Sequence, residues 1–306
     1  MTPYFYQRRG KGFTLVELLV AMGVTTLILT LLVSITGVAL DGWRISRNKV
    51  RSAQQAEAAI EQLSRDFESL VIRKGNSFEW LYAGGVEDAN TRQGGQGAQL
   101  AFFTAATDRY NGDLSGGLGD VCGVGYRLVY KNPVSNADDE FSVYGLYREL
   151  VNPDEAFDTL LAKDSLGGAN GAFNPFFDEI DEISNFVCEN IYQMTVGFLV
   201  EYTTMENDQV VTQYQRVTVV DTASTGNDQV SEFRLKGDSI DADLSDSQLM
   251  EEIRTGRITA VDISLQVVTE AAMGVIRSEA LNGERLQDFL EENSFRFGKT
   301  IPIPQN

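Results

Sequence analysis

The chain opens with a short polar segment that is followed by a long apolar run. Residues 13–40 read FTLVELLVAMGVTTLILTLLVSITGVAL, and Glu17 is the only charged residue among them. A helix rises about 1.5 Å per residue, so a run of this length can cross the roughly 30 Å hydrocarbon core of a bilayer. The pattern therefore predicts one membrane-spanning helix at residues 13–40.

The helical pattern continues beyond the apolar run, but with one apolar stripe instead of an apolar surface. Apolar residues recur at helical spacing among polar ones: Val50, Ala53, Ile60, Leu63, Phe67 and Leu70. A coiled coil is one alternative, but the stripe is too short for three or four heptads. We predict an amphipathic continuation at residues 41–75 that packs on a following sheet and stops at Lys74-Gly75-Asn76.

Residues 76–306 are rich in alternating apolar and polar positions separated by turn signals such as Gly84-Gly85. The fold class predicted is α+β, a long N-terminal helix packed on antiparallel β-sheet, in which residues 76–306 form a β-rich globular domain. Short helices are expected at residues 246–254 and 270–293. The strands are expected at residues 99–107, 121–130, 141–150, 194–202, 210–219, 258–269 and 294–303.

Charge and composition exclude several classes of function. The chain has 44 Asp and Glu against 25 Lys and Arg, a net charge of −19. Such a surface repels phosphate backbones, so we expect no nucleic-acid partner. The absence of histidine removes His-based nucleophile triads and His-ligated metal sites. We expect no cofactor, no metal and no enzyme activity.

Two cysteines and several acidic clusters remain as candidate chemistry. Cys122 and Cys188 can form one disulfide in an extracytoplasmic domain, with two buried thiols as the alternative. Residues 108–113 carry oxygen ligands and a glycine, but without the spacing of an EF-hand. The acidic clusters at 138–140, 178–182 and 238–246 offer carboxylates to a hydrolase, but we favour solvated loops as their explanation.

Three interpretations of the N-terminal segment compete. A cleaved secretory signal also has a basic start, but its apolar run is usually only about 7–15 residues. A plain membrane anchor fits the length and leaves Glu17 unexplained. The third starts from Gly12-Phe13-Thr14-Leu15-Val16-Glu17, which resembles the processing motif of type IV prepilins and pseudopilins.

The resemblance implies a specific maturation. A membrane aspartyl peptidase, the prepilin peptidase, would remove the leader at residues 1–12 by cutting between Gly12 and Phe13. It would then methylate the new amine of Phe13, and Glu17 would be the fifth residue of the mature chain. The amine of an incoming subunit would pair with Glu17 of a subunit already in the filament. The alternative for Glu17 is a hydrated or protonated acid near the membrane interface.

Basic residues lie on both sides of the apolar run, so the positive-inside rule does not decide the orientation of the helix in the membrane. The resemblance does decide it. The peptidase requires the leader in the cytoplasm, which implies a single-pass inner-membrane protein with its C-terminal domain in the periplasm or beyond. Other pilin-like subunits, an assembly ATPase and a membrane platform would be its partners.

The β-rich part is similar in pattern and order to the J-type minor pseudopilins of type II secretion and to the pilin-like cassette protein C of Verrucomicrobia. The similarity lies in residues 185–202 (NFVCENIYQMTVGFLVEY), in residues 257–268 (RITAVDISLQVV) and in a short strand near the C-terminus. It implies a non-catalytic subunit of a type IV pilus or a secretion pseudopilus. A singly anchored binding module or adhesin, and more weakly an anchored carboxylate hydrolase, are the alternatives.

Overall fold

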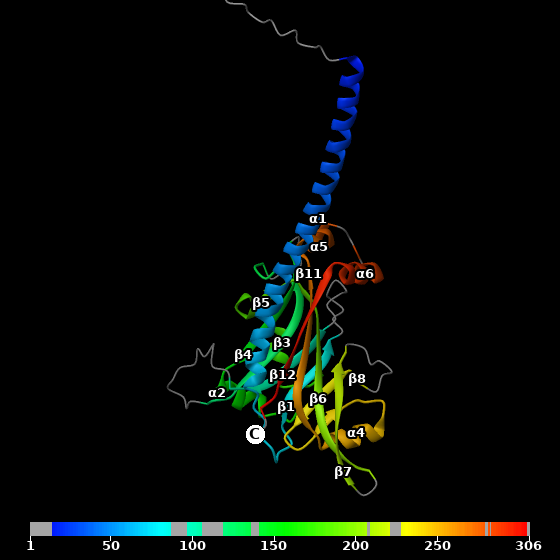
Figure 1. Ribbon diagram of the computed structural model, residues 1–306. Coiled ribbons are helices and arrows are strands. Elements are labelled where there is room, and N and C mark those ends of the chain that lie inside the picture. The colour runs from blue at the N-terminus through cyan, green and yellow to red at the C-terminus, as the bar shows by residue number, and fades with distance from the viewer. Residues whose placement is uncertain are drawn as a thin grey trace, which may run out of the picture. The chain divides into compact units, whose positions relative to one another are not determined.

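A helix of 54 residues, α1 (Leu15–Glu68), opens the structure (Figure 1). This computed structural model describes residues 14–86, 97–105, 119–135, 141–206, 209–220, 228–278, 281 and 283–304. The chain divides into two units, Met1–Lys49 and Val50–Asn306. In the first unit, no side chain between Thr14 and Lys49 is buried. The second unit contains the rest of α1 and all the strands.

The strands of the second unit form a sheet with two halves. One half has the order β10-β9-β1-β2-β3-β4-β5, and in the other half β6 lies between β7 and β11, with β12 beyond β11. The halves meet in a short parallel contact between Gly97 of β2 and Met194 of β6. Apart from this contact and the short β7–β8 pair, the described strands pair antiparallel.

The strand bounds are as follows: β1 Glu79–Val86, β2 Gly97–Thr104, β3 Cys122–Lys131, β4 Val143–Val151, β5 Phe186–Glu189, β6 Ile191–Glu206, β7 Gln209–Val219, β8 Gln229–Val230, β9 Glu232–Lys236, β10 Ile240–Ala242, β11 Arg257–Val268 and β12 Ser294–Pro302. The shorter helices are α2 Pro153–Glu155, the π-helix η1 Ala156–Leu160, α3 Asn174–Asp178, the 3-10 helix η2 Ile183–Asn185, α4 Ser247–Arg254, α5 Glu270–Ser278 and α6 Glu284–Glu292.

The C-terminal part of α1 packs on the inner face of the sheet. Ala59, Leu63 and Phe67 are fully buried there. The Phe67 ring stacks on Phe102 of β2 with centroids 4.4 Å apart. The same hydrophobic cluster continues through β6 and β11, so one core joins the helix to both halves of the sheet.

Two further layers complete the second unit. The connection from β4 to β5, with α2, η1 and α3, covers the opposite face of β1, β2 and β4. Its Phe173 lies against β3, where a Cβ on Gly125 would come within 2.3 Å of the ring. The helices α5 and α6 cover a third cluster, at the opposite end of the strands from α4 (Figure 1).

The predicted α+β class is confirmed, and the long strands lie within a few residues of their predicted bounds. The helix, however, ends at Glu68 and not near Asn76. Beyond it, Val71 N donates to Phe103 O (2.9 Å) and Ala105 N donates to Ser69 O (3.0 Å). The chain leaves the helix because these backbone groups bond to the end of β2.

Two other predictions need correction. Gly84 and Gly85, expected in a turn, lie inside β1. A Cβ on Gly84 would lie 2.1 Å from the Tyr82 hydroxyl, so glycine leaves room there for the phenol. The predicted helix at 270–293 is two helices, α5 and α6, with Gly283 preceding the second at a φ of 58°.

Candidate functional site

The N-terminal end of α1 is organised around Glu17. Thr14 N and Thr14 Oγ1 both donate to Glu17 Oε2, at 3.0 and 3.1 Å. Glu17 N in turn donates to Thr14 Oγ1 at 3.3 Å. This is a capping box, in which two residues reciprocally satisfy backbone donors left open at a helix start. The carboxylate also lies where the helix dipole favours negative charge.

Thr14 is a residue whose role the sequence analysis missed, although its T-x-x-E spacing from Glu17 is the signature of a capping box. Gly12 and Phe13, the predicted cleavage and methylation positions, lie outside the described residues. The structure thus places Glu17 in the first turn of α1, and the processing roles of Gly12 and Phe13 stay predictions.

The helix after Glu17 presents apolar side chains on all sides. Between Leu18 and Leu40 its large apolar side chains are at least 50% exposed. Four threonines in this span bond to carbonyls of the preceding turn, for example Thr25 Oγ1 to Ala21 O at 2.7 Å and Thr36 Oγ1 to Leu32 O at 2.8 Å. Their hydroxyls are therefore satisfied within the helix, which suits a lipid environment or a bundle of other helices.

By length and composition, α1 is the one helix among the described residues that is apolar enough to cross a membrane. A signal sequence near the N-terminus meets the same criteria, so the apolar run alone does not decide between the two.

The C-terminal part of α1 is fastened to the sheet by a buried ion pair. Asp66 of α1 and Arg148 of β4 are each 1% exposed. Arg148 donates from Nε to Oδ2 at 2.7 Å and from Nη2 to Oδ1 at 2.9 Å, a bidentate arrangement. The Tyr126 hydroxyl donates to the same Oδ2, and burial together with the Asp66 charge raises the pKa of Tyr126 well above its usual value.

A second attachment between α1 and the rest of the second unit lies on the N-terminal side of Asp66, at Arg51. Arg51 forms ion pairs with Glu270 of α5 and Glu189 of β5. Gln55 Nε2 also donates to Glu189 Oε1 at 3.2 Å. These groups are about half exposed, so they contribute less than the buried pair at Asp66.

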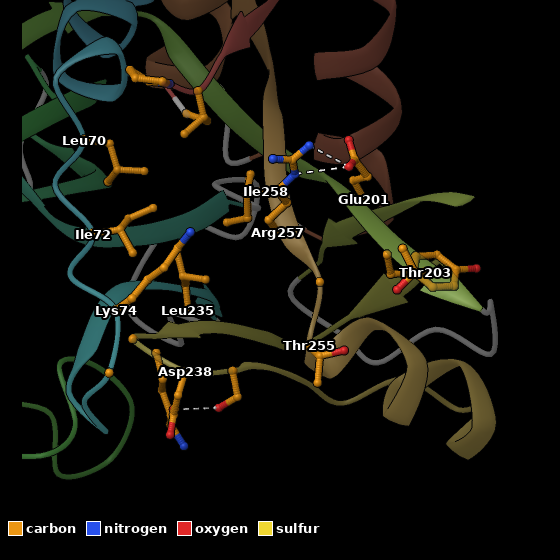
Figure 2. Close-up of a pocket in the computed structure, with 18 residues that line it drawn as sticks. Leu70, Ile72, Lys74, Glu201, Thr203, Leu235, Asp238, Thr255, Arg257 and Ile258 are labelled. Atoms are coloured by element: carbon orange, nitrogen blue, oxygen red, sulfur yellow. Dashed lines mark hydrogen bonds and ion pairs between the residues drawn. The ribbon is translucent and has the colours of Figure 1, made fainter. Parts of the chain in front are cut away.

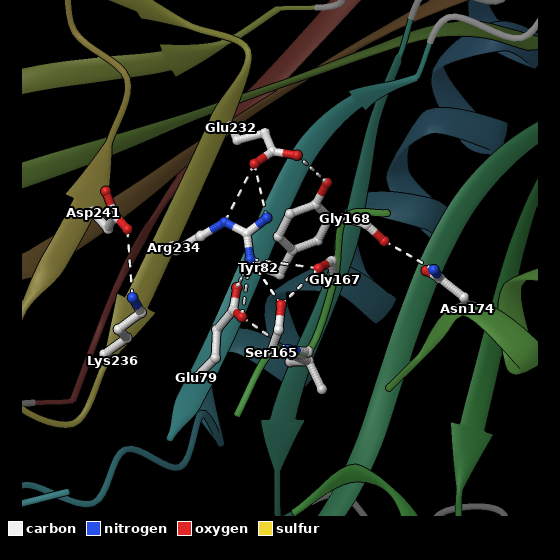
Figure 3. A network of polar contacts seen from close by, with 11 residues as sticks. Glu79, Tyr82, Ser165, Gly167, Gly168, Asn174, Glu232, Arg234, Lys236 and Asp241 are labelled. Carbon is white, nitrogen blue, oxygen red and sulfur yellow. Dashed lines mark hydrogen bonds and ion pairs between the residues drawn. The ribbon is translucent and has the colours of Figure 1, made fainter. Parts of the chain in front are cut away.

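A polar network on the outer face binds the loop at 165–168 to the sheet (Figure 3). Arg234 of β9 contacts Glu79 of β1 at 3.1 Å and Glu232 at 2.8 Å, and its guanidinium lies 5.0 Å from the Tyr82 ring centre. Leu166 N donates to Glu79 Oε2 at 2.8 Å. Burial raises the pKa of Glu79, while the Leu166 amide and Arg234 oppose that change.

The acidic clusters of the sequence hold structural contacts where they are described. Asp246 caps α4 by accepting from Gln248 N and Leu249 N, while Asp181 and Asp241 each pair with a lysine. Residues 108–113 and 138–140 lie outside the described residues. Within the described part of the chain, no group of three or more His, Cys, Asp or Glu side chains is placed to hold a metal ion.

Of the two alternatives for Cys122 and Cys188, a disulfide does not fit the sheet register and two buried thiols do. Both side chains are buried. Cys188 pairs with Leu146, and Leu146 pairs with Leu128, which is six positions from Cys122 along β3. Six strand residues span roughly 20 Å, whereas a disulfide needs Cα atoms within about 7 Å. The sequence left both alternatives open because the register of the strands cannot be read from it.

Comparison with known proteins addresses the N-terminal segment. The family model described as the prokaryotic N-terminal methylation motif matches residues 7–33. This match covers the end of the basic segment, Glu17 and the first part of the apolar run, and an antiparallel sheet follows the long helix. These findings support a type IV pilin-like protein. An apolar helix that carries this motif is typical of a single-pass membrane anchor, and the motif implies processing by prepilin peptidase and association with other pilins.

A solved structure of a type IV-like pilin from Thermus thermophilus is similar to this pilin-like protein over 82% of the chain and 96% of its own length. The identity is 11% and the TM-score 0.31, a likeness too distant to support any further argument. No curated protein matches the sequence.

Proposed function

We propose that this pilin-like protein is a minor pilin or pseudopilin, assembled through its N-terminal helix into a type IV pilus or a type II secretion pseudopilus, and that it performs no catalysis itself. The observation that carries the proposal is Glu17, a lone acid in the first turn of α1 and the only charged residue of the apolar run at residues 13–40. In this proposal residues 1–12 are the leader and 13–40 the filament-core helix. The amphipathic continuation runs to Glu68, and residues 76–306 belong to an extracytoplasmic domain.

The physical basis is charge compensation in a medium of low dielectric constant. An ionised carboxylate near the bilayer centre costs at least ~2.5 kcal/mol. Cleavage after Gly12 would create an ammonium at Phe13, four residues before Glu17. Pairing between the amine of one subunit and the Glu17 of its neighbour would offset that cost and define the register of the helices. The Thr14 capping box occupies one carboxylate oxygen, Oε2, which leaves Oε1 for such a partner.

The leader is cytoplasmic and the domain beyond α1 extracytoplasmic in this proposal, because the prepilin peptidase cuts on the cytoplasmic side. An assembly ATPase and a membrane platform drive extension indirectly.

Replacing the glutamate tests assembly. We expect Glu17→Gln to be processed and inserted in the membrane, yet to be lost from sheared filaments and from copurification with other pilin-like subunits. Glu57→Gln is the matched control, since Glu57 is an exposed glutamate further along the same helix. Mass spectrometry of the mature wild-type protein should show an N-methylated Phe13 as its first residue. Filament incorporation of Glu17→Gln at the wild-type level would refute the role given to this acid, and retention of residues 1–12 would refute the proposed maturation.

A further inference from the structure

A cavity of about 570 Å³ opens in the second unit, where several segments distant in sequence meet. Figure 2 shows Ile72 and Lys74, from the stretch after α1, on one side, and Arg257 and Ile258, from the start of β11, on the other. The end of β6, the β9–β10 turn and Ile303 complete the wall. The volume lies within the range of about 300–1,000 Å³ typical of small-molecule sites.

The base of this cavity is apolar. Leu70, Leu235, Ile258 and Ile303 line it, and each of them also belongs to the main hydrophobic core. Ile72 packs beside them and is only partly buried. A ligand here would therefore gain most of its affinity by removing an apolar body from water.

The rim carries charged side chains of both signs, and two of its three cations are held by acidic partners. Arg257 is held by Glu201 at 2.7 Å and Lys236 by Asp241 at 3.4 Å. Asp238 accepts from the Ser239 hydroxyl at 3.3 Å. Among the described residues, Lys74 has neither a hydrogen-bonding nor an ion-pair partner for its ammonium, so it is the cation at this rim that is left to meet a ligand.

We propose that this cavity binds an unbranched aliphatic monocarboxylate, with the carboxylate on the Lys74 ammonium and the acyl chain on Leu70, Leu235 and Ile258. The Lys74 ammonium, which has no partner of its own among the described residues, lies beside the apolar base and matches one negative charge on an apolar body. Phosphate ligands would call for several convergent donors, and sugars for a more polar base. The site is independent of filament assembly, because it involves no residue of the membrane helix.

Photolabelling of the full chain in lipid nanodiscs tests the site with a decanoate that carries a terminal diazirine. The probe also enters the bilayer, so labelling of residues 18–40 serves as an internal standard. Relative to that standard, we expect labelled peptides from β9 or the start of β11. Excess unlabelled decanoate should suppress this labelling, whereas decyltrimethylammonium, with the same chain and the opposite charge, should not.

Two variants with the same charge change separate the site from general affinity for lipid. Lys74→Ala should lower pocket labelling at least about tenfold, as expected for the loss of a hydrogen bond to a charged group, without changing labelling of residues 18–40. Lys163→Ala removes another exposed lysine, which does not line the cavity, and should label like the wild type. Equal labelling of Lys74→Ala and wild type, equal competition by decyltrimethylammonium, or labelling no stronger than on exposed loops would each overturn the proposal.

Discussion

At the scale of single residues, the pair formed by Asp66 and Arg148 has the largest consequence for this domain. Both charges are almost fully removed from water and satisfy each other through two hydrogen bonds. Breaking such a pair by removing one partner leaves an uncompensated buried charge. The attachment of α1 to the sheet therefore depends on both residues together.

We predict that Asp66→Asn lowers the free energy of unfolding by ~3–5 kcal/mol, because it leaves the Arg148 guanidinium buried without a compensating negative charge. The double variant Asp66→Leu/Arg148→Met should recover much of that loss. Thermal and denaturant unfolding of the purified full chain, followed by near-UV circular dichroism, measures both. Asp241→Asn, which breaks an exposed pair with Lys236, is the control and should cost at most ~1 kcal/mol. An equally small effect of Asp66→Asn would contradict this account.

Glu79 should make stability depend on pH in a defined direction. Burial raises its pKa above the usual value of 4.5, so the folded protein retains the proton to higher pH than the unfolded chain. The folded state then binds more protons in that window, and stability falls as pH rises from about 4.5 through the folded pKa. Relative to Glu79→Gln, the wild type should therefore lose unfolding free energy across that window. A difference between the two that stays constant or grows with pH would be inconsistent with the raised pKa.

At the scale of elements, α1 serves two environments with two surfaces. From Leu18 to Leu40 it is apolar on every side, with its threonine hydroxyls bonded to its own backbone. From Ser52 to Phe67 one face is buried and the other is polar. Small residues on the buried face let the helix backbone approach the sheet closely.

Two consecutive alanines of α1, one exposed and one buried, test this packing. Ala59 is 0% exposed, whereas Ala58 is exposed. We expect Ala59→Leu to overpack the interface and to reduce the unfolding free energy by ~1–3 kcal/mol. Ala58→Leu should change it by less than about 0.5 kcal/mol. The measurement is a pair of denaturant titrations, and similar losses in both variants would show that the helix does not pack as described.

At the scale of the whole molecule, all three hydrophobic clusters lie within Val50–Asn306. Among residues 14–51, which the structure describes, none is buried. The membrane segment can therefore be removed without taking a core side chain, whereas the C-terminal part of α1 cannot.

We predict that a fragment of residues 50–306 is soluble and unfolds cooperatively, while residues 70–306 form no stable fold. The shorter fragment exposes the inner face of the sheet because Leu63, Phe67 and the buried alanines are gone. Calorimetry and near-UV circular dichroism distinguish the two. A native-like transition in residues 70–306 would show that the helix is dispensable to the domain.

Much of this arrangement could be predicted from the sequence. The strand predicted at 194–202 shows its alternation because one face of β6 meets the core and the other does not. β1 gave no such signal, because nearly all of it is buried on both faces and it contains Gly84-Gly85. Pattern analysis detects half-buried strands and misses those covered on both sides.

By itself, the sequence determined the long helix, its apolar and amphipathic parts, the lone acid at Glu17 and the α+β class, since these depend on residues a few positions apart. The tertiary structure alone decided the partners of distant residues. Asp66 and Arg148 are 82 positions apart, and the separation of Cys122 from Cys188 depends on the register of three strands. The cavity beneath Lys74 likewise exists only once five segments have been folded together. Contacts of this kind arise from packing and strand register, which no local pattern encodes.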